Sequence, residues 1–278
     1  MVIEKVINNN VIGTRDDKNR ELIVMGKGIG FQKKKGDDVS EEKIEKRFVL
    51  DDANEVSKFA ELVNLIPLDY LKVSVDIIEY AKHAMSKRLS PSIYFSLADH
   101  INFALERMES GMNFQNPLFD EVRQFYPSEY LVGEYALDQI EKNIGVRLPK
   151  DEAASIALHL VNAEYNVGMS ETMKITSLIR EVLEIVEQEL DLVLDELGLH
   201  YSRFVTHLKF MAQRVFTNQL LDNQDDDFLN MIAEKYPIEY EVSKKIGEYI
   251  KENYKLDVTK EELVYLTVYI RRVRPDID

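Results

Sequence analysis

The residues in this sequence with the clearest chemical potential are histidines that recur in one local pattern. His100 and His207 are each followed by a branched apolar residue, then Asn or Lys, then Phe, and an arginine stands seven residues after each, at Arg107 and Arg214. Imidazole nitrogens are nucleophilic near neutral pH, so a histidine repeated in this way can act as a switch. The repetition indicates that two segments of the chain carry out related chemistry.

These histidines fall on helical stripes of apolar residues. In four segments the stripe fills positions i, i+3, i+4 and i+7, which lie on one face of a helix, and its second position is His100, His159, His207 or Tyr269. One interpretation is that each histidine is hydrogen-bonded in the core and inert. The other is favoured because three of the five histidines share the slot: phosphorylation would place about −1.5 to −2 charges against apolar contacts.

Other sites of chemistry are less strongly indicated. His83 and His200 fall outside the pattern and are expected at the surface. No two histidines have His-x-x-x-His spacing, and no carboxylate is expected to recur at ligand distance from the histidines in both repeats, so we predict no metal site and no cofactor. Because the sequence suggests neither a substrate pocket nor an acid/base pair, we expect no catalytic residues and a protein that is not an enzyme.

The elements that carry the histidines belong to a duplicated domain. Segment 126–130 returns as 236–240, an offset of 110, and a period of this size indicates two copies of an ordinary domain. Pro149 with the acidic residues after it, and the capping pattern Thr259–Glu262, are helix-start signals in the two copies. We expect two homologous all-α helical bundles that follow a linker: linker 56–66, first bundle 67–170, second bundle 171–278.

Residues 1–55 instead predict a small β domain. β-branched residues stand on both sides of the turn-forming run Asn8–Asn10, and Glu21–Met25 is a strand candidate bounded by a glycine. The polar run Arg15–Arg20 fits the tip of a hairpin. The predicted fold class is therefore mainly α, with a short antiparallel sheet ahead of the two bundles. About 50 residues is little for an independent core, so we expect the sheet to dimerise within a homodimer.

Residues 26–36 are rich in glycine and lysine. A nucleotide phosphate loop would need a helix directly afterwards, and Phe31 followed by a lysine run does not supply one. Two interpretations remain open. In the first, the glycines let the backbone approach a nucleic acid, Phe31 stacks on a base and the lysines contact phosphates. In the second, the run is a solvated hairpin whose lysine-rich edge prevents aggregation.

Composition restricts the class of protein. The sequence of 278 residues has no cysteine, which excludes disulfides and thiolate chemistry and fits the cytoplasm. Its start lacks a signal-peptide layout, and no window has the roughly 18 apolar residues of a membrane span. The net charge is −15, but residues 1–50 carry 11 Lys/Arg and 9 Asp/Glu, a net of +2. A mildly basic domain attached to an acidic body indicates different partners for the two parts.

The runs Val6–Ile12 and Gly26–Lys34, together with the repeated histidine segments, resemble the BglG/LicT family of bacterial transcriptional antiterminators, over the whole chain and in the same order. The resemblance implies a co-antiterminator RNA-binding domain over 1–55, followed by two phosphotransferase-system (PTS) regulation domains. It implies a homodimer that binds a hairpin in the leader RNA of a sugar-utilisation operon and prevents the overlapping terminator from forming. The resemblance points to a β-glucoside operon.

The resemblance also implies roles for individual residues. Those expected to line the RNA surface are Lys5, Asn8, Asn10, Gly26, Lys27, Gly28, Phe31, Gln32 and Lys33. His100 and His159 match sites through which the sugar-specific permease (enzyme II) represses, and His207 matches the first site through which the carrier protein HPr activates. Independently of the resemblance, Arg107 and Arg214 are candidate phosphate partners, because each lies two turns beyond its histidine.

One position departs from the family pattern. Tyr269 stands where the family has a histidine, and tyrosine cannot undergo the same phosphohistidine chemistry. We hypothesise that His207 alone carries activation, or that control by HPr is weakened. The alternative function is a PTS regulation domain activator that binds DNA. It would need a helix-turn-helix, for which residues 1–50 are too rich in β-branched residues and glycine.

Overall fold

The structure, a computed structural model of the chain, describes residues 1–278 except 18, 50–62, 64, 113, 222–225 and 275–278. The chain divides into two units, 1–167 and 168–278. The expected linker, 56–66, falls mostly outside the described residues. Within the part of the chain that is described, no helix combines the length and apolar character needed to cross a membrane.

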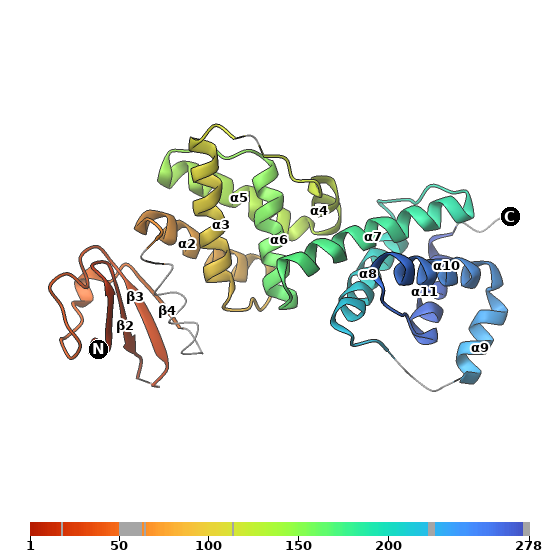
Figure 1. The fold of residues 1–278 in the computed structure, drawn as a ribbon, viewed down its shortest axis with the longest axis horizontal. Coiled ribbons are helices and arrows are strands. Elements are labelled where there is room, and N and C mark those ends of the chain that lie inside the picture. Colours follow the sequence, from red (N-terminus) through yellow and green to blue (C-terminus); the bar gives the residue numbers. More distant parts are fainter. Residues whose placement is uncertain (18, 50–62, 64, 113, 222–225, 275–278) are drawn as a thin grey trace. The chain divides into compact units, whose positions relative to one another are not determined.

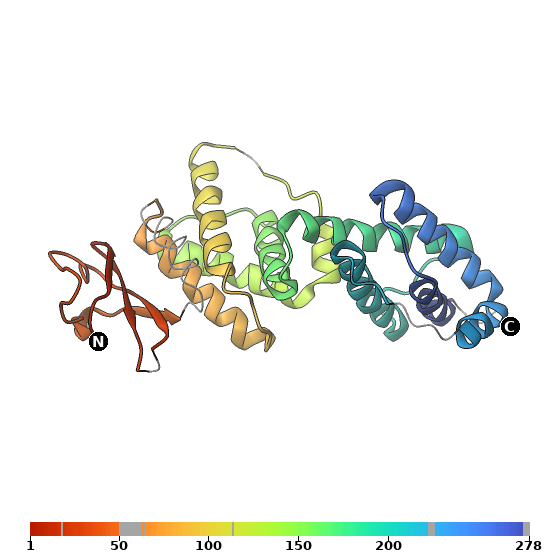
Figure 2. The ribbon, with the colours of Figure 1, turned by 60° about the horizontal axis from the view of Figure 1, so that its bottom comes forward.

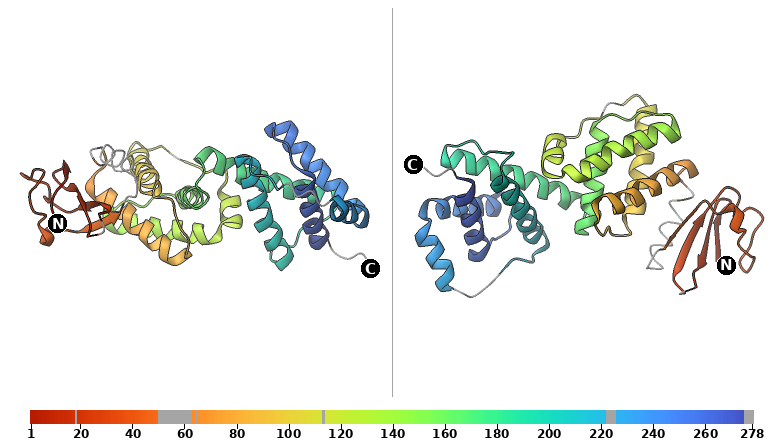
Figure 3. Two further views of the ribbon diagram at one scale, coloured as in Figure 1. Left: turned by 90° about the horizontal axis from the view of Figure 1, so that it is seen from below. Right: turned by 180° about the vertical axis from the view of Figure 1, so that it is seen from behind.

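The N-terminal domain is a four-stranded antiparallel sheet with its strands in sequence order (Figure 1; Figure 3). The strands are β1 (Lys5–Asn8), β2 (Val11–Arg15), β3 (Glu21–Met25) and β4 (Lys46–Val49). A short 3-10 helix, η1 (Glu41–Lys43), precedes β4. An apolar cluster forms the core of this domain: Ile3, Ile12, Leu22, Val24, Ile29 and Val39. The predicted antiparallel sheet is confirmed.

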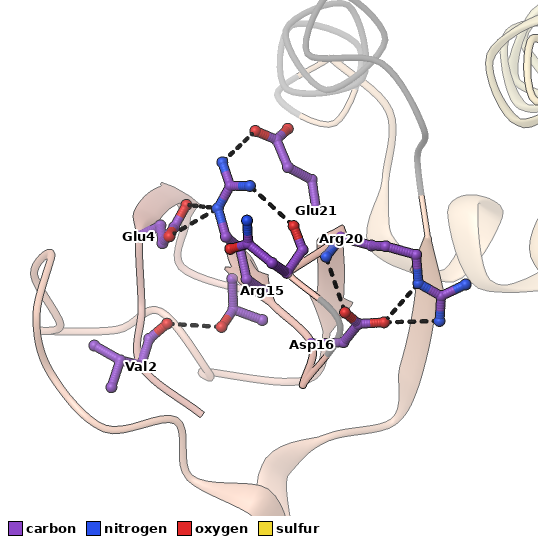
Figure 4. Close-up of polar contacts among 8 residues, drawn as sticks. Val2, Glu4, Arg15, Asp16, Arg20 and Glu21 are labelled. Carbon is purple, nitrogen blue, oxygen red and sulfur yellow. Dashed lines mark hydrogen bonds and ion pairs between the residues drawn. The ribbon is translucent and has the colours of Figure 1, made fainter.

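Paired charges hold the hairpin between β2 and β3 (Figure 4). Arg15 Nε lies 3.0 Å from Glu4 Oε1, and its Nη2 lies 3.0 Å from Glu21 Oε1. Arg20 Nη2 lies 2.7 Å from Asp16 Oδ2. The expected polar hairpin tip is confirmed, and its charged side chains pair with one another and with neighbouring strands.

The two helical bundles are built on one plan (Figure 1; Figure 2). The first contains α2 (Leu68–Met85), α3 (Ile93–Glu109), α4 (Phe119–Phe125), α5 (Pro127–Ile144) and α6 (Asp151–Tyr165). The second contains α7 (Met169–Leu190), α8 (Leu199–Thr217), α9 (Asp226–Lys235), α10 (Pro237–Tyr254) and α11 (Lys260–Val273). The pairs α2–α3, α2–α5, α3–α6, α4–α5, α4–α6 and α5–α6 pack in the first, and their counterparts pack in the second. The predicted duplication is thus confirmed in the helix packing.

Local sequence sets where these helices begin. α5 and α10 start with proline, whose fixed φ suits the first helical position and whose missing N–H is not needed there. α11 starts with the expected cap, because Thr259 Oγ1 accepts a hydrogen bond from the amide of Glu262 at 3.4 Å. α6 starts at Asp151, just after a proline, as predicted. His159 lies on α6 and Tyr269 lies on α11.

Candidate functional site

In the first bundle, two histidines from different helices face each other. His100 comes from α3 and His159 from α6, and their ring centroids are 4.7 Å apart with the ring planes tilted by 40°. Both rings are half-buried. The apolar positions of their stripes are buried, as predicted: Leu97, Ile101, Ala104, Ile156, Leu160 and Ala163. The packing of α3 against α6 therefore brings two of the predicted histidines into one site.

A buried carboxylate joins this histidine pair. Glu152 lies in the first turn of α6, and its Oε2 is 3.0 Å from Nε2 of His100. Its other oxygen pairs with the guanidinium of Arg107. That guanidinium lies over the ring of Phe114, 4.2 Å from the ring centroid. A buried charge needs a partner of opposite charge, and Arg107 supplies it for Glu152.

Burial keeps two of the imidazoles neutral. It lowers the pKa of His159 to about 3, and the charge that His100 can carry adds to the effect. Burial also lowers the pKa of His207 to about 4; Glu262 opposes this shift and Arg214 reinforces it. A neutral imidazole has one nitrogen with a free electron pair, so both rings are in the nucleophilic form at physiological pH.

The second bundle repeats the arrangement with one substitution. His207 on α8 stacks on Tyr269 on α11, with ring centroids 4.3 Å apart and an interplanar angle of 17°. Arg214 forms a bidentate pair with Glu262, at 2.6 Å to Oε1 and 2.7 Å to Oε2. Tyr269 thus occupies the place of His159. Its ring preserves the aromatic contact but supplies no second nucleophilic nitrogen.

Glu262 also fixes the chain that follows α8. Its Oε1 accepts a hydrogen bond from the amide of Leu221 at 3.2 Å. Thr259 Oγ1 donates to the carbonyl of Leu221 at 2.6 Å. The start of α11 therefore binds both Arg214 and the backbone of Leu221.

A pocket of about 390 Å³ opens beside His207. Arginine and aromatic side chains dominate its lining, which consists of Arg203, Thr206, His207, Phe210, Arg214, Leu221, Tyr265 and Tyr269. Guanidinium groups bind phosphate through charge-assisted hydrogen bonds. Arg214 remains a candidate phosphate partner although it is paired with Glu262, and Arg203, which the sequence pattern did not single out, joins it.

Two residues of these sites were missed in the sequence: Glu152 and Glu262. Each glutamate pairs with the arginine of its own bundle, and in the first bundle its second oxygen also lies against His100. Both stand seven residues before the shared slot at His159 and Tyr269, and this common spacing was the available signal. His83 and His200 are exposed, as expected.

In the N-terminal domain, asparagines hold the glycine-rich loop. Asn10 Oδ1 accepts a hydrogen bond from the amide of Gly28 at 2.9 Å. The Asn10 carbonyl accepts from the amide of Gly26 at 2.9 Å, and the Asn10 amide donates to Asn8 Oδ1 at 2.8 Å. The structure thus brings together four of the residues predicted to bind RNA, although the sequence separates them into two runs.

Close approach of the backbone explains the glycines. A β-carbon on Gly26 would overlap the carbonyl oxygen of Lys43, and one on Gly30 would overlap that of Asn8. Gly28 has a φ of 69°, in the left-handed region that glycine adopts without steric cost. The loop is therefore a closely packed backbone surface, which favours the nucleic-acid interpretation over a solvated hairpin edge.

Several predicted contact residues project from this loop. Phe31 is 57% exposed, and Lys27 and Gln32 are exposed as well. Lys33 is half-buried, and its Nζ donates to the Asp38 carbonyl at 3.2 Å. Lys5 instead lines a hollow of about 160 Å³ on the sheet. An exposed ring among lysines is suited to stacking on a base beside phosphate contacts.

Known proteins share this organisation. The CAT RNA binding domain matches residues 1–57, and the PRD domain matches residues 75–163 and 180–273. The chain is 47% identical over 273 residues to the transcription antiterminator LicT of Bacillus subtilis (strain 168), covering 98% of this chain and 99% of LicT. It is 41% identical over 277 residues to the beta-glucoside operon antiterminator of Dickeya chrysanthemi, covering 100% of this chain and 98% of that protein.

A solved structure agrees with the first part of the chain. The crystal structure of GlcT CAT-PRDI aligns with a TM-score of 0.51 and 34% sequence identity, over 59% of this chain and 97% of that one. Fold and matches define a class of protein with an RNA-binding β domain and two PRD domains. The chain belongs to the BglG/LicT family of transcriptional antiterminators. The DNA-binding alternative fails, because residues 1–57 match an RNA-binding domain and form no helix-turn-helix in their described part.

Proposed function

We propose that this protein is a sugar-responsive antiterminator that binds a hairpin in the leader RNA of a β-glucoside operon and prevents the terminator from forming. The observation that carries the proposal is the presence, in one chain, of the Asn–Gly surface on the N-terminal sheet and of duplicated histidine sites. The name of the Dickeya chrysanthemi relative supports the choice of sugar.

The N-terminal sheet binds the hairpin as a homodimer. RNA-binding proteins achieve specificity mainly at loops and bulges, where unpaired bases stack and show their edges. Phe31 supplies a stacking surface, and Lys5, Lys27 and Lys33 supply charge for phosphates. One sheet domain of this size buries little apolar surface and is only marginally stable alone. Pairing of two copies stabilises the sheet, and the dimer then binds one hairpin.

Phosphorylation of histidines controls binding. Phosphoryl groups on His100 and His159 repress under the direction of enzyme II, and a phosphoryl group from HPr on His207 activates. Because Tyr269 is no acceptor, His207 acts alone in the second bundle. Phe103 and Phe210, three residues after the histidines and 54% and 52% exposed, offer the partner protein an apolar contact beside each acceptor.

The energy of such a modification is sufficient for a switch. Moving a two-state balance from 1:99 to 99:1 needs about 5.5 kcal/mol, and an unpaired buried ion costs several kcal/mol. The phosphoryl groups remain on the protein as signals and are not passed on, so the protein is not an enzyme. It acts in the cytoplasm, where leader RNA is made.

Transcription of a β-glucoside operon leader by purified RNA polymerase tests this function. We expect the full-length protein to increase read-through of the terminator, and we expect a paired substitution that restores a broken hairpin stem to restore the effect. Addition of HPr, enzyme I and phosphoenolpyruvate should raise read-through further for the protein without substitutions but not for His207→Ala. The proposal fails if read-through does not depend on the protein, or if the same sequence as duplex DNA binds equally well.

A further inference from the structure

Each of the three candidate acceptor histidines has one buried ring nitrogen. The buried atoms are Nε2 of His100, Nδ1 of His159 and Nε2 of His207. Among the described residues, Nδ1 of His159 and Nε2 of His207 have no hydrogen-bond partner, whereas Nε2 of His100 faces a carboxylate oxygen at 3.0 Å. All three histidine residues are nevertheless only half-buried. A phosphoryl group transfers in line, so the attacking nitrogen must reach the phosphorus along an open path at roughly 3–3.5 Å. The buried nitrogen of each ring has no such path.

Glu152 places a second constraint on His100. Its carboxylate oxygen Oε2 lies 3.0 Å from the buried Nε2. A neutral imidazole carries one proton, and a neighbouring carboxylate favours the tautomer with that proton on the nitrogen that faces it. The free electron pair of His100 is then on Nδ1. A carboxylate orients catalytic histidines in the same way.

We propose that the fold selects which nitrogen is phosphorylated: Nδ1 of His100, Nδ1 of His207 and Nε2 of His159. Glu152 is the positioning residue for His100. This inference rests on the proposed phosphorylation of these histidines and adds the accepting atom. The two histidines of the first bundle, although their rings lie 4.7 Å apart, thus accept through different nitrogens.

In the transfer to His100, the electron pair on Nδ1 forms a new N–P bond while the N–P bond of a phosphohistidine donor breaks. The electron pair of the broken bond returns to the donor ring, which keeps the proton on its other nitrogen and leaves as neutral imidazole. His100 becomes a phosphoimidazolium with its own proton still on Nε2. The Glu152 carboxylate faces the positive charge of that ring, and Arg107 holds the carboxylate through its other oxygen.

Isomer-specific analysis of the phosphorylated full-length protein tests the assignment. Three variants each retain one of the three candidate histidines, with the other four histidines of the chain, His83 and His200 included, changed to glutamine. Each variant is treated in parallel with phosphoramidate and with phosphorylated HPr. Long-range ¹H–¹⁵N spectra distinguish the two phosphohistidine isomers. We expect the Nδ1 isomer when His100 or His207 is retained, and the Nε2 isomer when His159 is retained. The opposite isomer at any of them overturns the assignment.

The two donors separate failure of this inference from failure of the proposed function. Phosphoramidate requires no recognition of a partner protein. The expected isomers from phosphoramidate, with no labelling of His207 by HPr, would contradict the proposed function and leave the assignment standing. If HPr labels His207 on Nε2, the nitrogen assignment is contradicted and the proposed function stands. A folded protein that neither donor labels would overturn both.

Glu152→Gln tests the positioning role. The neutral amide cannot stabilise the imidazolium, so we expect phosphorylation of His100 to slow by roughly 10²-fold and its pH profile to shift, while His207 reacts at its usual rate. Glu129→Gln is the matched control, because Glu129 is also a buried carboxylate of the first bundle but pairs with Lys87, at 2.6 Å. If folded Glu152→Gln is phosphorylated on His100 with the same rate and pH profile as Glu129→Gln, Glu152 does not position His100.

Discussion

At the scale of single residues, the two bundles differ at the partner of the first histidine. His159 and Tyr269 occupy the same place on α6 and α11, and each packs against a histidine of the neighbouring helix. An imidazole can accept a phosphoryl group there, whereas the phenol keeps only the aromatic contact. The first bundle therefore offers two candidate acceptors and the second offers one.

The substitution Tyr269→His is expected to give the second bundle a second acceptor. The new imidazole would lie against His207, as His159 lies against His100, and HPr-dependent incorporation of phosphate into the second bundle should double. Mass spectrometry of peptides prepared under non-acidic conditions measures it. Tyr269→Phe is the control, because it preserves the ring and adds no nucleophile; equal incorporation into the two variants would contradict the expectation.

Buried histidines also make stability depend on pH. An unfolded histidine has a pKa near 6.5, whereas burial lowers the pKa of His207 to about 4, with Glu262 opposing this shift and Arg214 reinforcing it. The unfolded state binds more protons between these values, so the contribution to stability is complete above about pH 6.5 and is lost as the pH falls toward about 4.

A comparison with His207→Gln isolates this contribution. The unfolding free energy of the unmodified protein, relative to that of the variant, should fall by on the order of 1–2 kcal/mol between pH 7 and pH 5. Urea denaturation at the two pH values measures the difference. A difference that is the same at both would show that His207 does not titrate as the structure indicates.

The sequence predicted the histidines but not their glutamates, for a physical reason. The histidines were evident because they repeat at a fixed offset and interrupt an apolar stripe. Glu152 follows Asp151 in the first turn of a helix, where acidic residues are common because they interact favourably with the helix dipole. Its special role arises only from the packing of α3 against α6, which local sequence does not encode.

At the scale of elements, the glycine-rich loop that we propose contacts RNA depends on a distant strand. β-branched runs and turn residues were sufficient to predict the first three strands. The pairing of β4 with β3, from Leu22 opposite Val49 to Met25 opposite Lys46, joins segments that are far apart in the chain, and residue patterns do not specify such pairings. This pairing brings Lys43 against Gly26, and the local sequence alone could not explain that glycine.

Gly26→Ala should therefore loosen the N-terminal sheet. The added β-carbon would overlap the carbonyl oxygen of Lys43, and relief of such overpacking costs about 1–3 kcal/mol. Hydrogen exchange of the β2 and β3 amides measures the loss. Gly13→Ala is the control, since the nearest atoms to its β-carbon, at 3.6 and 3.8 Å, are at ordinary contact distance. Equal exchange in the two variants would contradict the packing argument.

At the scale of the whole molecule, charge is divided between the parts of the chain. Residues 1–50 have a net charge of +2, and the remaining residues carry 24 Lys/Arg and 41 Asp/Glu, a net of −17. The acidic body repels nucleic acid in general, so a small number of lysines near the glycine-rich loop must supply the electrostatic attraction to RNA.

Salt dependence of RNA binding tests this division. Lys27→Ala should reduce the slope of log affinity against log salt by about 0.9, because one phosphate contact is lost. Phe31→Ala should lower the affinity by about 1–3 kcal/mol through lost stacking, with the slope unchanged. Filter binding at several salt concentrations measures both. Lys142→Ala, an exposed lysine of the first bundle, is the control, and a matching loss of slope there would refute the division.

The shared helix pairings of the two bundles affect how the molecule compares its inputs. On the proposed scheme, in which the first bundle represses and the second activates, a change in temperature or ionic strength that shifts both bundles alike would cancel. The state of the imidazoles does not cancel. The duplicated helix packing would thus make the protein insensitive to conditions that affect both bundles equally. The residue at position 269 would change the response of the second bundle to phosphorylation without changing that of the first.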